Sequence, residues 1–209
     1  FNQAFRYAAE PFFFAKEKEK DAEQTYRNVM NYFIIFNSFI FLSIMLFLDI
    51  VMYFVGADFR VGVQIIPIVL LANLCLGIYF NLSIWYKLTG KTLYGAGIAI
   101  GGAMITIVLN YIWIPKFGYI GSAWATLICY FTMMLVSYIL GQRHYPISYN
   151  LVKGIGYPLA VVTLYQLSTL TSLAANGYHY LINTVILLLF VGTVYKLEKP
   201  KFAASNPVK

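Results

Sequence analysis

Apolar residues gather along this chain into six long runs, and almost all charged residues lie in the short gaps between them. The runs cover residues 28–55, 61–85, 92–114, 118–140, 155–176 and 178–195. Each approaches or exceeds the ~20 residues with which an α-helix crosses the ~30 Å apolar core of a bilayer. Backbone groups in lipid must find their hydrogen bonds within the chain, so these runs are expected to be helices. The pattern therefore predicts an all-α, polytopic integral membrane helix bundle with six transmembrane helices.

The beginning of the chain differs from these runs. Residues 1–14 are apolar and aromatic but contain Arg6 and Glu10, and they lack the basic start and small-residue cleavage site of a signal peptide. We interpret them as the end of a truncated seventh transmembrane helix that stops near Pro11. Residues 15–27 form a charged linker whose opposite charges recur three and four residues apart, as in an exposed helix. The chain is therefore interpreted as the back half of a longer, transporter-like protein.

The remaining organisation follows from the same pattern. Pro67 is expected to kink the second helix or to mark its first turn, and the short loop around Pro115 predicts a tight helical hairpin. The predicted segments after the linker are four transmembrane helices over 28–140, a cytoplasmic loop over 141–154, two additional helices over 155–195, and a polar, disordered tail over 196–209.

Composition agrees with a membrane protein: 60% of the residues are hydrophobic and only 11% are charged, against about 25% charged in soluble domains. The formal net charge of +7 does not indicate nucleic-acid binding, because the basic residues form no single patch. Leaving Arg6 aside, twelve of the fifteen Lys and Arg residues fall on one predicted side, and only Arg60 and Lys116 fall on the other. The positive-inside rule therefore predicts a cytoplasmic linker and a cytoplasmic tail in the inner (plasma) membrane.

Few ionisable groups lie at membrane depth, and each has two interpretations. Arg6 and Glu10 are four residues apart, so they share a helix face and can pair. They either line a central pathway or anchor a helix end at the interface. Asp49 lies about 10 Å from the outer end of the first run. It is a weak candidate for a coupling cation or proton, against the alternative that it faces water or bonds a neighbouring helix.

Asparagines and small residues supply the other candidates. Asn73 and Asn81 are ~80° apart around one helix, so they share one side; they either bond neighbouring helices or form the wall of a hydrophilic cavity. Small residues in the third and fourth runs let helix backbones approach closely, which predicts a tightly packed hairpin. These packing residues are Gly95, Gly97, Gly101, Gly102, Gly121 and Ala125.

No catalytic constellation is visible, so an enzyme is not predicted. His144 and His179 lie in different predicted loops, and Cys75 and Cys129 fall inside apolar runs, where they are read as packing residues. No metal site and no cofactor is predicted. A membrane-embedded polymerase or ligase of surface polysaccharides would need a large outer loop with Arg and His, and this sequence has none.

Three segments resemble the C-terminal half of bacterial polysaccharide biosynthesis and export flippases, of a Bacteroidetes type. They read AFRYAAEPFFF, NLSIWYKLTGKTLYG and TIVLNYIWIPKFGYIGSAWATLICY. The family belongs to the multidrug/oligosaccharidyl-lipid/polysaccharide exporter superfamily. The resemblance covers about residues 1–150, and its most specific part is the N-x-x-x-x-P-x-F-G-x-x-G-x-A-x-A-T pattern from Asn110 to Thr126. The last two runs match only in hydropathy.

The resemblance implies a C-lobe of a two-lobed transporter, with a missing N-terminal lobe of the same protein as partner. The implied activity is the flipping of an undecaprenyl-diphosphate-linked oligosaccharide across the inner membrane. Such cavities are cationic, so Arg6 becomes the first candidate contact for the diphosphate, because a guanidinium can bind phosphate through two hydrogen bonds. Lys87 and Lys91, at the expected cytoplasmic mouth, would attract the same head group. The alternatives are half of a cation-coupled multidrug antiporter of the same superfamily and a non-transporting membrane scaffold subunit.

Overall fold

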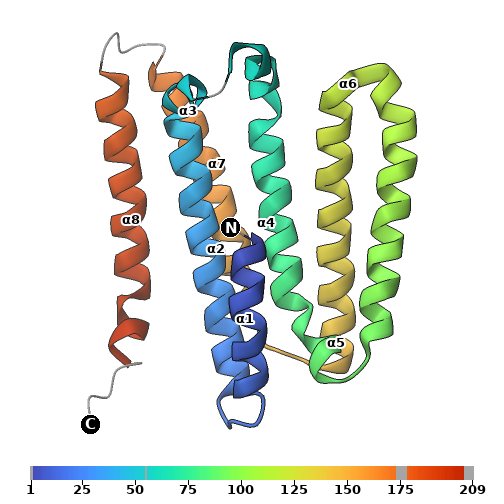
Figure 1. Cartoon of the computed structure of the whole chain (residues 1–209). Helices are drawn as coiled ribbons and strands as arrows, with labels where there is room; N and C mark the ends of the chain where they lie inside the picture. The colour runs from blue at the N-terminus through green and yellow to red at the C-terminus, as the bar shows by residue number, and fades with distance from the viewer. Residues whose placement is uncertain (1, 55, 173–177, 205–209) are drawn as a thin grey trace.

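The protein is a bundle of helices, seen here in a computed structural model that describes residues 2–54, 56–172 and 178–204 (Figure 1). These described residues contain helices and turns and no strand, which confirms the all-α expectation. The elements are α1 Asn2–Lys16, α2 Ala22–Leu46, α3 Leu48–Tyr53, the 3₁₀ helix η1 Ala57–Ile65, α4 Ile66–Leu82, α5 Ile84–Leu88, α6 Thr92–His144, α7 Leu151–Ser172 and α8 His179–Ala204.

The long helices run alternately up and down the bundle. In Figure 1, α2 rises, α4 descends, α6 rises and returns, α7 rises and α8 descends. Four helical stretches within the described residues are long and apolar enough to cross a membrane: Ala22–Leu46, Arg60–Leu88, Thr92–His144 and His179–Glu198. The stretch Thr92–His144 counts once although its chain reverses direction, and α7 is not among the four. Four membrane-spanning candidates are therefore established, and the count of six spans stays a prediction.

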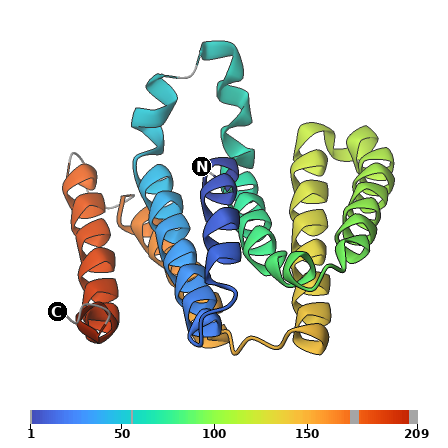
Figure 2. The same cartoon turned by 60° about the horizontal axis from the view of Figure 1, so that its bottom comes forward.

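The reversal inside α6 takes place at Gly118, whose backbone angles are φ 57° and ψ −138°. A positive φ is readily adopted by glycine and rarely by other residues. The two limbs, 92–117 and 119–144, stand side by side and antiparallel in both cartoon views (Figure 2). Pro115 lies within the last turn of the first limb, and the chain turns back at Gly118, within the short segment where the sequence predicts a hairpin.

Small residues let the limbs approach at some positions but not at others. A Cβ at Gly102 would come within 2.6 Å of Met133 Sδ, and one at Gly121 within 2.8 Å of the Trp113 carbonyl oxygen. Ala125 is fully buried. A Cβ at Gly97 or Gly101 would meet nothing within 4 Å, so the GxxxG pair does not pack in the hairpin as we expected.

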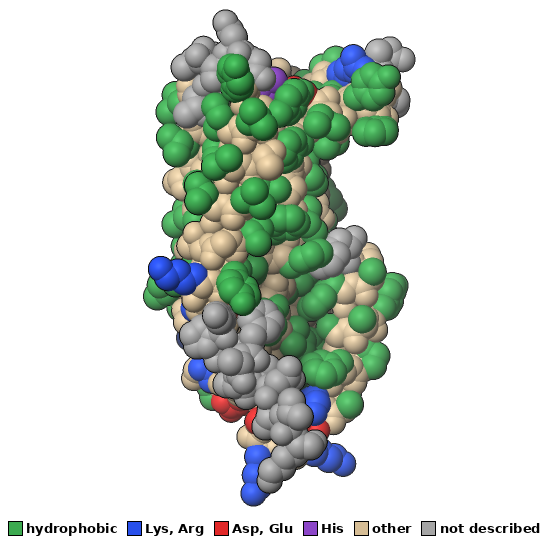
Figure 3. Space-filling model, turned by 90° about the vertical axis from the view of Figure 1, so that its left-hand side faces the viewer, with side chains coloured by type: hydrophobic (Ala, Val, Ile, Leu, Met, Phe, Trp, Pro, Cys, Tyr) green, Lys and Arg blue, Asp and Glu red, His purple; other side chains and the backbone are tan. Residues whose placement is uncertain are grey.

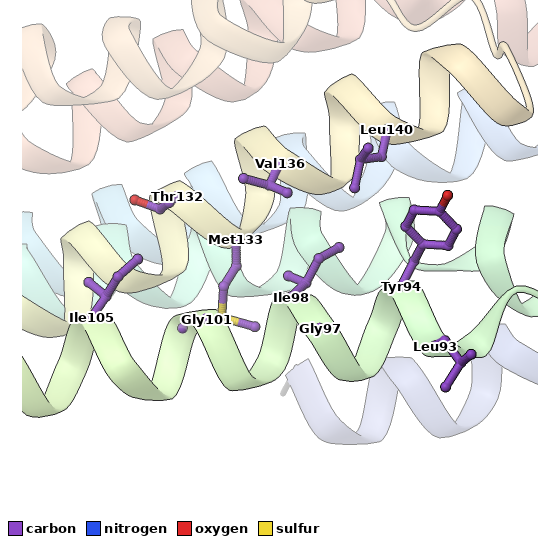
Figure 4. Close-up of a pocket in the computed structure, with 11 residues that line it drawn as sticks. Leu93, Tyr94, Gly97, Ile98, Gly101, Ile105, Thr132, Met133, Val136 and Leu140 are labelled. Carbon is purple, nitrogen blue, oxygen red and sulfur yellow. The ribbon is translucent and has the colours of Figure 1, made fainter.

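Gly97 and Gly101 instead line an apolar groove of about 440 Å³ between the limbs. Figure 4 shows Ile98 and Ile105 of the first limb pointing toward Met133 and Val136 of the second. The remaining glycine of the predicted set, Gly95, lies against the ring of Tyr86, where a Cβ would come within 2.6 Å of Cε2.

Two of the predicted helices are interrupted. The run 28–55 is not one helix, because α2 ends at Leu46 and α3 begins at Leu48. Asn183 of α8 donates a hydrogen bond from Nδ2 to the Leu46 carbonyl oxygen at 2.6 Å, which satisfies a group that the end of α2 leaves without a partner in its own helix. The run 61–85 is divided as well, between η1, α4 and α5, with Pro67 in the first turn of α4.

The charged segments at the two ends of the chain differ from the prediction. Pro11 lies inside α1, which continues to Lys16. The linker 15–27 is not a separate helix: it is a turn over 17–21 flanked by the end of α1 and the start of α2. The tail is not disordered over its whole length, since α8 extends to Ala204; residues 205–209 lie outside the described residues.

The helices pack in two groups. A large apolar cluster joins α2, α4, α7 and α8, with Leu42 and Val161 near its centre. A smaller cluster joins α1, α2, α5 and the linker after α6, around Phe13 and Ile84. In Figures 1 and 2, α1 lies between α2 and α4, both of which it contacts. Figure 3 shows hydrophobic side chains over the middle of one face and most of its charged side chains at the lower end.

Candidate functional site

The candidate site is a charged seam formed by Arg6 and Glu10 of α1 and Lys87 of α5. Arg6 Nε lies 3.1 Å from Glu10 Oε1, and Lys87 Nζ donates to the same oxygen at 2.5 Å. The helical spacing of four residues aligns Arg6 with Glu10, while contact of α1 with α4 and α5 brings Lys87 alongside. Three of the six predicted substrate-binding residues therefore meet at one carboxylate.

The charged seam is neither fully buried nor fully in water. The side chains of Arg6, Glu10 and Lys87 are 35%, 29% and 22% exposed. Two cations share one carboxylate, so the seam has one positive charge in excess. A partly desolvated site with unbalanced positive charge favours an anion, because each charge–charge interaction is stronger there than in bulk water.

Aromatic rings surround the guanidinium of Arg6. Its Cζ lies 5.2 Å from the ring centroid of Phe80 and 5.7 Å from that of Tyr7. Contacts of this kind hold a cation over a ring face without using its hydrogen-bond donors. Within the part of the chain that the structure describes, nothing accepts a hydrogen bond from Arg6 Nε, despite its closeness to Glu10. The guanidinium is thus positioned by rings and charge, with donor capacity left over.

A second contact fixes the upper part of α1 against α4. Asn2 Nδ2 donates to the backbone oxygen of Asn73 at 2.7 Å. Asn2, Arg6 and Glu10 are spaced by four residues, so one face of α1 carries the polar contacts with α4 and α5. These contacts join this face of α1, which includes Arg6, to α4 and α5.

Asn73 and Asn81 do not act together, although they lie on the same side of α4. Asn73 is exposed and its Nδ2 donates to the Val69 oxygen at 2.9 Å. Asn81 is buried and its Nδ2 donates to the Gly77 oxygen at 3.0 Å. Both amides thus bond the backbone of their own helix, four residues back. The Oδ1 of Asn81 has no hydrogen-bond donor among the described residues.

The remaining predicted site residues lie away from the charged seam. Lys91 is exposed at the start of α6, next to Gly90 in the turn after α5. Asp49 is exposed in the first turn of α3. Among the described residues, neither Lys91 nor Asp49 forms a hydrogen bond or ion pair with another predicted site residue. The structure therefore brings together the Arg6, Glu10 and Lys87 part of the prediction and separates the rest.

A second charged cluster was missed by the sequence reasoning. Glu198 of α8 is only 1% exposed, and its Oε1 accepts hydrogen bonds from Lys153 Nζ and, at 2.8 Å, from the Tyr157 hydroxyl of α7. Asn150 precedes α7 and accepts a bond from the Lys153 backbone N–H at 3.1 Å, as an N-cap residue does. A weak signal existed, because Asn150 three residues before Lys153 marks a helix start that would have placed Lys153 in the first turn.

Charges near the turn after α1 are solvated and locally paired. Lys16 Nζ donates to both carboxylate oxygens of Glu19, at 2.9 and 2.7 Å. These hydrogen bonds raise the pKa of Lys16. Elsewhere among the described residues, no three His, Cys, Asp or Glu side chains lie close enough together to hold a metal ion. The Cys129 thiol donates to the Gly102 oxygen at 3.2 Å and serves the packing of the α6 hairpin.

The charged seam is an arrangement for electrostatic binding: it has two cations, one carboxylate and flanking rings. No family model, no curated protein and no solved structure matches this chain. The charged seam, together with the resemblance of three segments to polysaccharide flippases, is therefore what indicates a function.

Proposed function

We propose that this chain is the C-terminal half of a membrane transporter that flips undecaprenyl-diphosphate-linked oligosaccharide across the inner membrane for surface polysaccharide biosynthesis. The observation that carries the proposal is the charged seam, in which Arg6 and Lys87 converge on Glu10 with one positive charge in excess. The segment resemblance adds the nature of the cargo, and the four membrane-crossing candidates add the setting.

The proposed mechanism is an exchange of anions at the charged seam. Without cargo, Glu10 neutralises part of the charge of Arg6 and Lys87. An arriving diphosphate competes for both cations, with the guanidinium able to form two parallel hydrogen bonds and the ammonium acting as a point charge. Because Glu10 remains nearby, it weakens the binding, and a transporter must release its cargo as well as capture it. Glu10 is in this view the residue that keeps the affinity moderate.

The proposed topology has six spans, with the linker and the C-terminal end in the cytoplasm. Its support is that the helix ends carrying most of the basic residues lie together at one end of the bundle (Figure 1). The 3₁₀ helix η1, which contains Arg60, and the reversal of α6, next to Lys116, lie toward the other end. A bilayer with more positive charge on its cytoplasmic side would orient the bundle in this way. The charged seam then faces the cytoplasmic mouth, and an N-terminal lobe closes the cavity and rocks against this one.

A binding measurement with a short polyprenyl diphosphate tests the role of the seam. Farnesyl diphosphate is titrated into the purified chain, and binding is followed by calorimetry. We expect Arg6→Gln to weaken binding roughly 10- to 100-fold, which is the loss of one or two charge-assisted hydrogen bonds. Glu10→Gln is expected to strengthen it, since the competing carboxylate is removed. Lys20→Gln, an exposed charge in the turn after α1, is the matched control and should bind normally.

Equal binding by wild-type protein, Arg6→Gln and Lys20→Gln would refute the anion site. Export of surface polysaccharide provides the second readout, in cells that carry the same substitutions in the intact transporter. There, loss of export with Arg6→Gln at normal expression supports transport, and normal export contradicts it.

A non-transporting membrane scaffold subunit is the second candidate, and one observation favours it. The Nδ2 groups of Asn73 and Asn81 bond their own helix backbones, and Asn81 is buried, so these amides offer few donors to a passing ligand. A scaffold predicts that Arg6→Gln leaves diphosphate binding unchanged and lowers only the stability of the bundle. The same titration, combined with an unfolding measurement, therefore separates the two candidates.

A further inference from the structure

A cavity of about 330 Å³ lies between α2, α4, the second limb of α6 and the start of α7. Its size is at the lower end of the range of small-molecule pockets. The walls are almost entirely apolar, with Ile34 of α2 and Ile78 and Leu82 of α4 among them. The cavity shares no residue with the charged seam.

One polar group in this lining is anomalous. Asn31 lines the cavity and is only 4% exposed. Among the residues that the structure describes, none accepts a hydrogen bond from its Nδ2. Buried donors without an acceptor are rare in folded proteins, and each needs an explanation. The other polar side chains of the lining are Tyr138, Tyr149 and Asn150, and Asn150 is exposed. A buried, unpaired amide donor in this largely apolar lining indicates a ligand with an apolar body and one hydrogen-bond acceptor.

The mouth of the cavity indicates where this ligand comes from. Its rim carries four exposed apolar side chains, from the second limb of α6 and from α7: Phe131, Leu135, Leu151 and Ile155. An opening framed by exposed apolar side chains faces lipid more readily than water. Entry is therefore sideways, from the surface that the bilayer covers.

The depth at which Asn31 lies in the bilayer indicates which part of a lipid can reach it. Arg27, the last charged residue before it, lies four residues or about 6 Å earlier on α2. Tyr138 and Tyr149 line the same cavity, and such residues are typical of the interfacial belt of a bilayer. Burial raises the pKa of the Tyr149 phenol, which keeps it neutral. Asn31 thus lies just beneath the level of the charged head groups.

We infer that this cavity binds one acyl chain of a bilayer phospholipid, with an ester carbonyl oxygen accepting a hydrogen bond from Asn31 Nδ2. Ester carbonyls lie between the head groups and the hydrocarbon, at the depth argued for Asn31. The acyl chain fills the apolar volume and holds α7 against α2, α4 and α6. The inference requires membrane placement but not transport, so it can hold or fail independently of the proposed function.

Two glycines of α7 provide a matched pair of variants. Gly154 lines the cavity, and a Cβ there would meet only Ile34 Cδ1 at 3.8 Å, so Gly154→Leu can fill the space without a clash at its first atom. Gly156 is exposed, and a Cβ there meets nothing within 4 Å. Gly156→Leu therefore tests the effect of a leucine on the same helix outside the cavity.

The probes are two phosphatidylglycerols with the same eighteen-carbon monounsaturated chains, attached through ester linkages in one and through ether linkages in the other. Lipid retained by the purified chain is counted by native mass spectrometry. Wild-type protein and Gly156→Leu should retain the ester lipid about two- to tenfold better than the ether lipid, because only the ester supplies a carbonyl acceptor. Asn31→Leu should abolish this preference, and Gly154→Leu should lose both lipids. Unchanged retention by Gly154→Leu, or an ester preference that survives Asn31→Leu, would overturn the inference.

Photolabelling tests the same site in the wild-type protein, so its result does not depend on whether the variants fold. A phosphatidylglycerol with a diazirine in the first third of its acyl chain should label peptides that contain residues 30–34 and 131–138. Labelling spread evenly over exposed apolar helices, with no enrichment in these two peptides, would contradict the site. Enrichment that the ester lipid competes away at about two- to tenfold lower concentration than the ether lipid supports it.

Discussion

Glu10 and Glu198 are two carboxylates that each bind a lysine from another helix, yet their surroundings differ. Glu10 is 29% exposed and receives two cations, Arg6 and Lys87. Glu198 is 1% exposed and receives Lys153 and the Tyr157 hydroxyl. The first carboxylate is shared in a site with water access, and the second is enclosed between α7 and α8.

The difference teaches which charges can serve binding. A buried carboxylate has lost its hydration, so removing its cation leaves a charge that nothing nearby can solvate well. A partly exposed carboxylate can exchange its partners for water or for another ion at small cost. We therefore interpret the Glu198 cluster as a fixed link between α7 and α8, and the charged seam as the adjustable site.

Lys153→Met is expected to have the largest effect, about 3 kcal/mol of lost unfolding free energy, because it removes a cation from a buried carboxylate. Unfolding in mixed micelles, followed by circular dichroism during SDS titration, measures it. Lys196→Met, an exposed lysine of α8, is the matched control and should change stability little. The double variant Lys153→Met/Glu198→Gln should recover much of the loss, since it removes both charges. No recovery would mean that packing, and not charge, holds the link.

Tyr157→Phe is expected to cost less, about 1.5 kcal/mol, because it removes one hydrogen bond to a charged group and leaves the ring in place. The same titration checks it. Tyr165→Phe provides the control, because Tyr165 lies about two turns further along α7 than Tyr157. If Tyr157→Phe loses less unfolding free energy than the control, the Tyr157 hydroxyl does not stabilise Glu198 and Lys153 is its effective partner.

Local spacing was sufficient to predict the parts of the site that one helix makes by itself. The four-residue separation of Arg6 and Glu10 places both on one face, and the structure pairs them at 3.1 Å. The short loop around Pro115 likewise predicted the hairpin, because a proline interrupts helical hydrogen bonding; the turn itself is made by Gly118, which can adopt a positive φ. Lys87, by contrast, is 77 residues from Glu10 in sequence. Spacing along the chain carries no information about such a contact, which depends on how α1 packs on α5.

Other features left no clear sign in the sequence. The break at Phe47 occurs within an apolar run that has no proline or glycine nearby, and a buried amide from α8, Asn183, meets the freed carbonyl oxygen. The polar composition near the C-terminus predicted a disordered tail. Glu198 lies in that segment, so its burial was not expected. Gly97 and Gly101 matched a packing motif, but a motif does not say which helix face meets a neighbour, and theirs borders a groove.

Lys87→Met tests the Glu10 half of the comparison. It is expected to lower the free energy of unfolding by only about 0.5 kcal/mol. Glu10 keeps Arg6 as a partner and has access to water, so no stranded charge results. The measurement is again SDS titration, beside Lys153→Met. A loss as large as that of Lys153→Met would show that the charged seam is a structural link, and the anion-exchange mechanism would then fail.

Ionic strength is expected to have the smallest effect on stability, and it distinguishes most directly between the two ion pairs. Between about 0.01 M and about 1 M ionic strength the screening length falls from ~30 Å to ~3 Å, which weakens exposed ion pairs far more than buried ones. The stability difference between wild-type protein and Lys87→Met should therefore shrink toward zero at high salt, while that of Lys153→Met should persist. The two variants change the same residue type at side chains of similar exposure, 22% and 23%. Any contrast in their salt response must then come from the carboxylates, Glu10 in contact with water and Glu198 enclosed, and an equal response would remove the distinction between an adjustable and a fixed pair.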